Sequence, residues 1–300
     1  TFEALRAAHG HEYQLRSMCS KDVLRFHTAR DITAFKTSMQ EPIVDENLTG
    51  SKTKELTAVS LFSHVFTIDL DEGDIQAFSA EANDSKAVRK MVRSLDKRQL
   101  IIGVDRLDYS KGLYQRFLSS ERLLEKYPNT QNNITLMQIA PPTRVGVRAY
   151  DEIRWELEQV SGRINGRFAS SDWVPIRYLN KGISRKPLMG FFRNADVGLV
   201  TPVRDGMNLV AKEYVVAQDP DDPGMLVLSS LAGAACELTD AVIVNPYDRD
   251  SVADGIATAI TMSLEERRER HASMLKILKK NDITAWRTRF VDALLSRSAS

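Results

Sequence analysis

The sequence predicts an α/β fold with a parallel sheet, because short apolar runs alternate with helical stretches from about residue 98 onward. Helical spacing occurs at about 113–127, 145–162, 185–194, 208–218 and 250–263. The apolar runs, typical of buried strands, are "QLIIGVDRL", "NITLMQIAPP", "VPIRYLN", "ADVGLVTPV", "GMLVLSSLAG" and "AVIVNPYD". This alternation indicates right-handed βαβ units and a doubly wound sheet.

The two ends of the chain are less regular. Two helices are expected to flank "DVLRFHT", followed by a polar stretch and a strand in "HVFTIDL". The segment "SAEANDSKAVRKMVRSLDKR" predicts a linker and a charged helix that enters a second domain. The tail "NDITAWRTRFVDALL" predicts an amphipathic helix, with Trp286, Phe290 and Leu294 spaced to bury one face.

Composition indicates a globular protein of about two domains. The 300 residues are 43% hydrophobic and 27% charged. Because 41 basic residues balance 40 acidic ones, no overall field favours nucleic acid or an anionic membrane. Cys19 and Cys236 form no disulfide framework and are expected in the core. No signal peptide or membrane-length apolar run is apparent, which predicts a cytoplasmic protein.

Cations follow the first predicted strand of the regular region. In "GVDRLDYSKGL", Arg106 and Lys111 surround a turn at the carboxyl end of the strand. An arginine and a lysine so placed suit a diphosphate, because one makes bidentate contacts and the other is a compact charge. The alternative is a surface ion-pair cluster with Asp105 and Asp108.

Two further loops follow predicted strands at the same edge. "IAPPTRVGV" projects Arg144, and "VRDGMNLVAKE" places a tight turn at Gly206 before a helix. The amides of residues 207–210 then suit an anion or sugar hydroxyls. Asp205 could accept hydrogen bonds from hydroxyl groups, although an N-cap is the alternative role. Glu213 could accept hydrogen bonds from both hydroxyls of a ribose, although a solvated helix position is the alternative.

The sequence favours no metal site. "DLD" at 69–71 and "DRD" at 248–250 match a short acidic pattern that holds metals in some sugar transferases. Such short patterns arise often by chance, and Asp248 follows "NPY" in a turn where aspartate is ordinary. The five histidines lack partners at ligand spacing.

The motifs "VDRLDYSKGL", "RDGMNLVAKEYV", "GRING", "LAGAACEL" and "VNPYDRD" resemble the α,α-trehalose-phosphate synthase (UDP-forming) family of retaining glycosyltransferases. The resemblance covers the carboxyl-terminal two thirds of such an enzyme. It implies a GT-B fold, with a complete Rossmann-like donor domain and a partial first one. It also implies residues 1–78 as the acceptor-side remnant, 79–282 as the donor domain, and 283–300 as a helix packing back toward the first domain.

The resemblance also implies a role for each matching residue. Arg106 and Lys111 hold the donor diphosphate, and Arg144 lies near the acceptor phosphate. Asp205 with the amides of Gly206 and Met207 holds the transferred glucose. Backbone groups of three further residues contact the phosphates and the nucleotide: Asn208, Leu209 and Val210. Glu213 contacts the ribose.

The implied reaction is glucose transfer from UDP-glucose to glucose 6-phosphate in trehalose biosynthesis, without metal or cofactor. Alternatives are a related glycosyltransferase with another phosphorylated acceptor, such as glucosylglycerol-phosphate synthase, and a non-catalytic nucleotide-sugar binding module. The expected partners are the two substrates, with no nucleic acid or membrane, and a homo-oligomer stays open. The family's glycine-rich loop and "HIPFP"-like motif do not occur, and "TIDL" stands where relatives read "PIGI". We therefore expect residues 1–300 alone to bind UDP weakly and to transfer no detectable glucose.

Overall fold

The structure, a computed structural model, describes residues 23–40, 62–65, 71–144, 146–281 and 283–298. The chain divides into two compact units: residues 69–282 form one, and residues 1–68 with 283–300 form the other. The predicted domain boundary at residue 78 lies inside a helix of the first of these units. The assignment of the units to donor and acceptor substrates stays a prediction.

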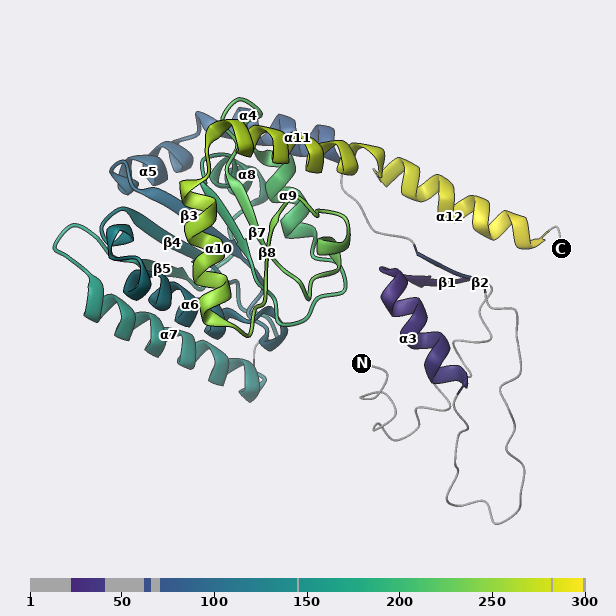
Figure 1. Cartoon of the computed structure of the whole chain (residues 1–300), viewed down its shortest axis with the longest axis horizontal. Helices are drawn as coiled ribbons and strands as arrows, with labels where there is room; N and C mark the ends of the chain where they lie inside the picture. Colours follow the sequence, from purple (N-terminus) through teal and green to yellow (C-terminus); the bar gives the residue numbers. More distant parts are fainter. Residues whose placement is uncertain (1–22, 41–61, 66–70, 145, 282, 299–300) are drawn as a thin grey trace, which may run out of the picture. The chain divides into compact units, whose positions relative to one another are not determined.

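The unit of residues 69–282 is built on a six-stranded parallel sheet, which confirms the predicted α/β class (Figure 1). Its spatial order, β5-β4-β3-β6-β7-β8, reverses direction between β3 and β6, as in a doubly wound nucleotide-binding fold. The strands are β3 (Gln99–Val104), β4 (Ile134–Ile139), β5 (Ile176–Leu179), β6 (Val197–Val200), β7 (Met225–Ser229) and β8 (Val242–Val244). All six predicted strands are therefore present.

Helices cover both faces of this sheet (Figure 1). One layer holds α6 (Leu113–Lys126), α7 (Arg148–Phe168) and α10 (Arg249–Thr261). The other holds α4 (Glu72–Asn83), α5 (Lys86–Leu95), α8 (Arg185–Arg193), α9 (Leu209–Ala217) and α11 (Leu264–Lys280). Short 3-10 turns η1 (Tyr109–Lys111), η2 (Pro128–Thr130) and η3 (Gly233–Cys236) complete the unit.

Three expectations need correction. Residues 79–83 are not a linker: they are the last part of α4, which packs against α8 and buries Ala82. Helix α7 continues to Phe168 instead of ending near 162, because Ile164 is buried against the core. Cys236 is exposed rather than buried, since η3 ends at the surface. Cys19 lies outside the described residues.

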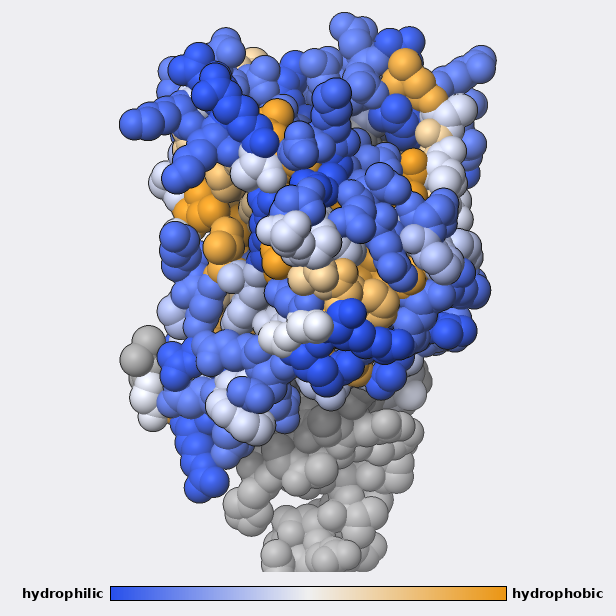
Figure 2. Space-filling model, turned by 90° about the vertical axis from the view of Figure 1, so that its left-hand side faces the viewer, coloured by the Kyte–Doolittle hydropathy of each residue, from blue (hydrophilic) through white to orange (hydrophobic). Residues whose placement is uncertain are grey.

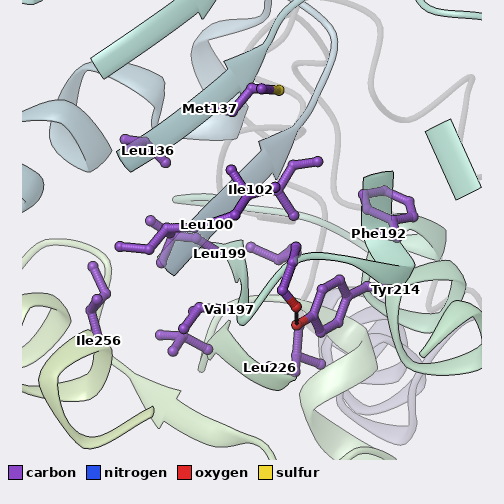
Figure 3. Close-up of a cluster of buried hydrophobic side chains, with 14 of the residues drawn as sticks. Leu100, Ile102, Leu136, Met137, Phe192, Val197, Leu199, Tyr214, Leu226 and Ile256 are labelled. Carbon is purple, nitrogen blue, oxygen red and sulfur yellow. Dashed lines mark hydrogen bonds between the residues drawn. The ribbon is translucent and has the colours of Figure 1, made fainter. Parts of the chain in front are cut away.

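A continuous apolar core joins the sheet to both helical layers, as Figure 3 shows for side chains from β3, β4, β6 and α9. Tyr214 of α9 is 1% exposed, and its hydroxyl donates to the carbonyl of Ala195 at 2.9 Å. A Cβ at Gly198 would lie 2.6 Å from the Tyr214 ring. The glycine in β6 therefore lets α9 approach the sheet closely.

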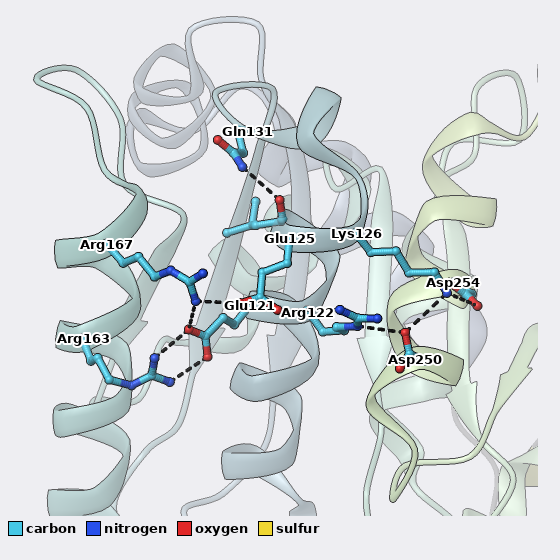
Figure 4. Close-up of polar contacts among 10 residues, drawn as sticks. Glu121, Arg122, Glu125, Lys126, Gln131, Arg163, Arg167, Asp250 and Asp254 are labelled. Atoms are coloured by element: carbon cyan, nitrogen blue, oxygen red, sulfur yellow. Dashed lines mark hydrogen bonds and ion pairs between the residues drawn. The ribbon is translucent and has the colours of Figure 1, made fainter.

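Ion pairs join the three helices of the layer that holds α6, α7 and α10 (Figure 4). Glu121 of α6 accepts a bidentate pair of hydrogen bonds from Arg163 of α7, at 2.6 and 2.7 Å, and a further bond from Arg167 at 3.0 Å. On the opposite side of α6, Arg122 donates to Asp250 of α10 at 2.8 Å. These contacts fix the directions of the three helices relative to one another.

In the second unit, β1 (Val23–Phe26) pairs in parallel with β2 (Phe62–Val65), and α3 (Ala29–Gln40) packs on both strands. Thr28 and Asp31 exchange hydrogen bonds at the start of α3, a capping arrangement. The predicted tail helix is α12 (Ile283–Ser298), in which Trp286 and Phe290 stack at 5.5 Å while Leu294 is exposed. The predicted strand "HVFTIDL" overlaps β2, and its residues 66–70 lie outside the described ones.

The molecular face in Figure 2 is mostly hydrophilic, with hydrophobic residues in small separate groups. Such scattered groups are ordinary for a protein surface. Among the helices that the structure describes, we find no segment with the length and apolar character that a membrane span requires.

Candidate functional site

The candidate residues gather where the strand order reverses. In an open parallel sheet, the loops that leave neighbouring strands on either side of this point diverge and leave a crevice at their carboxyl ends. The loop after β3 carries Arg106 and Lys111, and the loop after β6 carries Asp205. A backbone hydrogen bond from the amide of Arg204 to the carbonyl of Ser110, at 3.1 Å, joins the two loops.

The β3 loop is shaped by Asp108 and Gly112. The Asp108 carboxylate accepts from the amide and the hydroxyl of Ser110, at 3.0 and 2.8 Å, and so starts η1. Burial opposes ionisation of Asp108, but the bonds from Ser110 and the charges of Arg106 and Lys111 outweigh it and lower its pKa. Gly112 has φ +64°, and a Cβ there would lie 2.9 Å from the carbonyl oxygen of Thr201. Glycine thus lets the β3 loop pack against the β6 loop.

Lys111 and Asp205 form the central contact of the site. The Lys111 ammonium lies 2.5 Å from Oδ2 of Asp205, and their side chains are only 15% and 16% exposed. Arg106 is 59% exposed in its side chain and lies 3.9 Å from Asp108, so its guanidinium faces solvent. The predicted diphosphate cations therefore differ: one is ion-paired within the site, and the other is largely available.

Asn208 shapes the β6 loop. Its backbone is left-handed, at φ 79°, and its Oδ1 accepts from the amide of Ala211 at 3.0 Å, which makes it the N-cap of α9. Its Nδ2 donates to Oδ2 of Asp205 at 3.0 Å. The alternative that Asp205 is the N-cap is thus wrong, and the side-chain role of Asn208 was missed by the sequence reasoning. An asparagine directly before the helical pattern was the available signal.

Backbone donors surround the same turn. The carbonyls of Asp205 and Met207 accept from the amides of Gly233 and Ala234, at 3.1 and 2.7 Å, so η3 holds the turn in place. Among the described residues, none accepts a hydrogen bond from the amides of residues 207–210, which are Met207, the N-cap Asn208 and the first two residues of α9. Gly206 is exposed, whereas Met207 is buried and Leu209 and Val210 are half-buried. These amides are available to an anion or to hydroxyl groups.

Glu213 lies one turn into α9 with a side chain that is 21% exposed. Its nearest ion-pair partner in the described part of the chain is Arg185, at 3.9 Å. Burial raises the pKa of Glu213, and the Arg185 charge offsets part of this rise. The alternative of a fully solvated position is therefore wrong, and Arg185 is a neighbour that the sequence reasoning did not name.

Arg144 lies at the carboxyl end of β4. Its backbone is left-handed, at φ 49°, and its guanidinium carbon lies 5.4 Å from the centre of the Tyr150 ring. A hydrogen bond from the amide of Leu107 to the carbonyl of Pro141, at 3.0 Å, ties this loop to the β3 loop. Arg144 is exposed, and it is not part of the ion pair between Lys111 and Asp205.

A buried ion pair that the sequence reasoning did not identify underlies the site. Arg116 of α6 is fully buried, and its guanidinium donates to Asp105 at 2.7 Å, to Gln138 at 2.8 Å and to Thr201 at 3.0 Å. These acceptors lie at or near the ends of β3, β4 and β6. One side chain thus holds together the three strands whose loops form the site.

The acidic patterns have structural roles. Asp71 caps α4 by accepting from the amide of Asp74, and Asp248 caps α10 by accepting from the amides of Asp250 and Ser251. Asp250 also pairs with Arg122. Within the described ranges, no three His, Cys, Asp or Glu side chains are grouped closely enough to hold a metal ion.

Sequence comparison relates the chain to known enzymes. The profile of glycosyltransferase family 20 matches residues 6–296. A trehalose-6-phosphate synthase of Klebsiella pneumoniae is 48% identical over 296 residues, which cover 98% of this chain and 62% of the relative. A relative from Citrobacter koseri with the same name is 47% identical over 291 residues, which cover 97% and 61%. The chain thus spans less than two thirds of the length of these relatives.

Comparison with solved structures relates the chain to the same family of enzymes. An α,α-trehalose-phosphate synthase (UDP-forming) from Burkholderia xenovorans, in complex with glucose-6-phosphate, superposes with a TM-score of 0.90 at 45% identity, covering 97% of this chain and 65% of that one. An E. coli structure bound with UDP-2-fluoro glucose gives 0.88 at 44% identity, covering 97% and 64%. The likeness confirms the predicted α/β fold of GT-B type. The chain belongs to glycosyltransferase family 20.

Proposed function

We propose that this protein transfers glucose from UDP-glucose to glucose 6-phosphate, giving trehalose 6-phosphate and UDP. The observation that carries the proposal is that Lys111, Asp205 and the amides at the start of α9, which have no acceptor among the described residues, lie at the same carboxyl edge of the sheet. A cation and free amides suit a diphosphate, and a carboxylate suits the hydroxyl groups of the sugar linked to it. The proposal is supported by relatives of the same family that are named trehalose-6-phosphate synthase, and by solved structures in complex with glucose-6-phosphate and with UDP-2-fluoro glucose.

Each candidate residue takes a proposed role in this reaction. Arg106 and Lys111 bind the diphosphate, and Arg144 the phosphate of the acceptor. Asp205 accepts hydroxyls of the transferred glucose. Glu213, whose carboxylate is partly buried, accepts hydrogen bonds from the ribose. Backbone groups of the turn complete the donor site: Gly206, Met207, Asn208, Leu209 and Val210.

The chemistry that these groups support is assistance to the leaving group. As the bond between glucose and UDP breaks, negative charge grows on the terminal phosphate. Cations and amides that are already fixed in place stabilise this charge without reorganising, which lowers the barrier. Asp205 does not act as a glycosidase-type nucleophile in this scheme, because the acceptor hydroxyl attacks from the face that the phosphate leaves. The hydroxyl oxygen bonds to the glucose carbon as the bond to UDP breaks, and the hydroxyl proton passes to the departing phosphate. We propose the cytoplasm as the location, since both substrates are intracellular phosphate esters.

The test is titration calorimetry of the chain with UDP, GDP and ADP, and with UDP-glucose. UDP and UDP-glucose should bind to the wild type. Arg106→Ala and Lys111→Ala should each weaken the binding of UDP by about 1.5–3 kcal/mol, the range for hydrogen bonds to charged groups. Arg148→Ala is the matched control, because Arg148 is 93% exposed and pairs only with Glu152 among the described residues. Absence of UDP binding, or unchanged affinity in both site variants, contradicts the proposal.

A further inference from the structure

The contact between Lys111 and Asp205 raises a question about nucleotide affinity. The cation that we assign to the diphosphate already has a carboxylate 2.5 Å away, in a place where both side chains are mostly shielded from water. Electrostatic interactions between shielded charges are several times stronger than in bulk water. A diphosphate that binds Lys111 therefore shares this cation with a fixed negative charge.

The geometry of Asp205 also leaves one oxygen free. Its Oδ2 accepts from Lys111 and from Asn208, whereas no described residue donates to its Oδ1. The carboxylate is held in place from two directions by these donors. The free oxygen is available to a sugar hydroxyl but has nothing to offer to a phosphate.

The two nucleotides that visit the site differ in charge beside this group. The terminal phosphate of UDP is bonded only to the other phosphate, and a phosphate with a single substituent keeps a second ionisation near pH ~6. In UDP-glucose the sugar is bonded to that phosphate, so the second ionisation does not exist. Near pH 7, free UDP therefore carries nearly one more negative charge, on the phosphate that lies next to the sugar position.

We propose that Asp205 makes the site prefer the intact sugar nucleotide over the free nucleoside diphosphate. It accepts hydrogen bonds from the sugar, and it repels the extra charge of the product while withholding part of the charge of Lys111. The proposal rests on the function proposed above and adds a second role for Asp205, which is to assist the release of UDP after transfer.

The experiment compares the wild type with Asp205→Asn, measuring the affinities for UDP, UDP-glucose and uridine. The amide has the same shape and still offers an oxygen to Lys111 and Asn208, so the turn keeps its contacts. We expect UDP to bind about tenfold tighter to the variant, with UDP-glucose gaining less and uridine unchanged. The wild type should prefer UDP-glucose over UDP more strongly at pH 7.5 than at pH 5.5. In the variant, where Arg106 and Lys111 face the phosphate without Asp205, this preference should not rise with pH.

The matched control is Asp172→Asn, which removes a carboxylate 2.5 Å from Arg98 at the opposite edge of the sheet. It should leave all three affinities unchanged. A wild type that does not bind UDP overturns the proposed function itself. A wild type that binds UDP, with a variant that binds UDP no tighter, overturns only the role of Asp205. The pH profile of the wild type tests the same role without any variant, and a flat profile also overturns it.

Discussion

Replacing Arg116 with methionine should destabilise the sheet unit by about 3–4 kcal/mol. The substitution removes the only charged donor to Asp105 among the described residues and leaves a carboxylate whose side chain is 2% exposed. Breaking a buried pair in this way costs about 3–5 kcal/mol. The carboxylate can instead take up a proton, at about 1.4 kcal/mol per pH unit above its pKa. From an ordinary value of 3.8 this costs about 4 kcal/mol at pH 7, and less because burial raises the pKa of Asp105.

The pH dependence of this loss has a defined sign. Burial raises the folded-state pKa of Asp105, Arg116 opposes the rise, and its removal lets the pKa rise further. A group whose pKa is raised by folding favours the folded state at low pH and loses that contribution as the pH rises. The difference in free energy of unfolding between the variant and the wild type should therefore be smaller at pH 5 than at pH 7, by about 1–2 kcal/mol.

The assay is urea denaturation followed by tryptophan fluorescence in protein that carries Trp155→Phe and Trp286→Phe, so that the signal comes from Trp173, which is 3% exposed and donates to the carbonyl of Ile134 at 2.7 Å. Arg122→Met is the matched control, because Arg122 lies on the same helix but is 40% exposed and pairs at the surface. It should cost less than about 1 kcal/mol. The double variant Asp105→Asn with Arg116→Met should recover part of the loss, since no charge stays buried alone. If Arg116→Met cost no more than Arg122→Met, the buried pair would have no special role.

Two further predictions concern glutamates. Glu213→Gln should weaken UDP by about 1.5–3 kcal/mol while leaving glucose 6-phosphate affinity unchanged, by calorimetry, because only the nucleotide carries a ribose; a lower melting temperature with equal UDP affinity would instead give Glu213 a structural role. Glu121→Gln should lower the free energy of unfolding by about 1 kcal/mol at pH 7. The hydrogen bonds from Arg163 outweigh burial and lower the pKa of Glu121 in the folded protein. Its contribution to the free energy of unfolding is therefore present above pH 4.5, the ordinary pKa of the group, and is lost as the pH falls below that value. Chemical denaturation at pH 7 and pH 4 checks this, and an equal loss at both values contradicts it.

The sheet could be predicted from the sequence because its signals are local. Six apolar runs, each ended by turn residues, correspond to the six strands of one sheet. Helix α11 was missed although its signal was present. Ser263 caps it by accepting from Glu266, and its buried residues recur at helical spacing: His271, Met274, Leu275 and Leu278. The linker prediction for residues 79–83 was wrong because the small residues of this segment suit a close contact: Ser79 is buried in α4, and Ala82 packs on Gly190.

The candidate site was predictable in its parts but not in its contacts. Chain order places Arg106, Lys111 and Asp205 after strands, and parallel topology brings those strand ends to one edge. The pairing of Lys111 with Asp205 joins residues 94 positions apart, which no local pattern encodes. The left-handed backbone of Asn208 likewise depends on contacts of the whole turn with η3 rather than on its neighbours in sequence.

Stability and substrate binding are separated by depth at this edge of the sheet. Arg116 and Asp105 lie beneath the loops with side chains 0% and 2% exposed, whereas Lys111 and Asp205 lie above them at 15% and 16%. Changes in the lower pair leave a charge without water or partner, so they act first on folding. Changes in the upper pair leave groups that water can reach, so they act first on the ligand. Arg116 links Asp105, after β3, to Thr201, after β6, and Lys111 links the β3 loop to Asp205 in the β6 loop. Substitutions at Arg116 should therefore reduce UDP affinity only in proportion to the loss of fold, while substitutions at Lys111 should reduce it in a protein of normal stability.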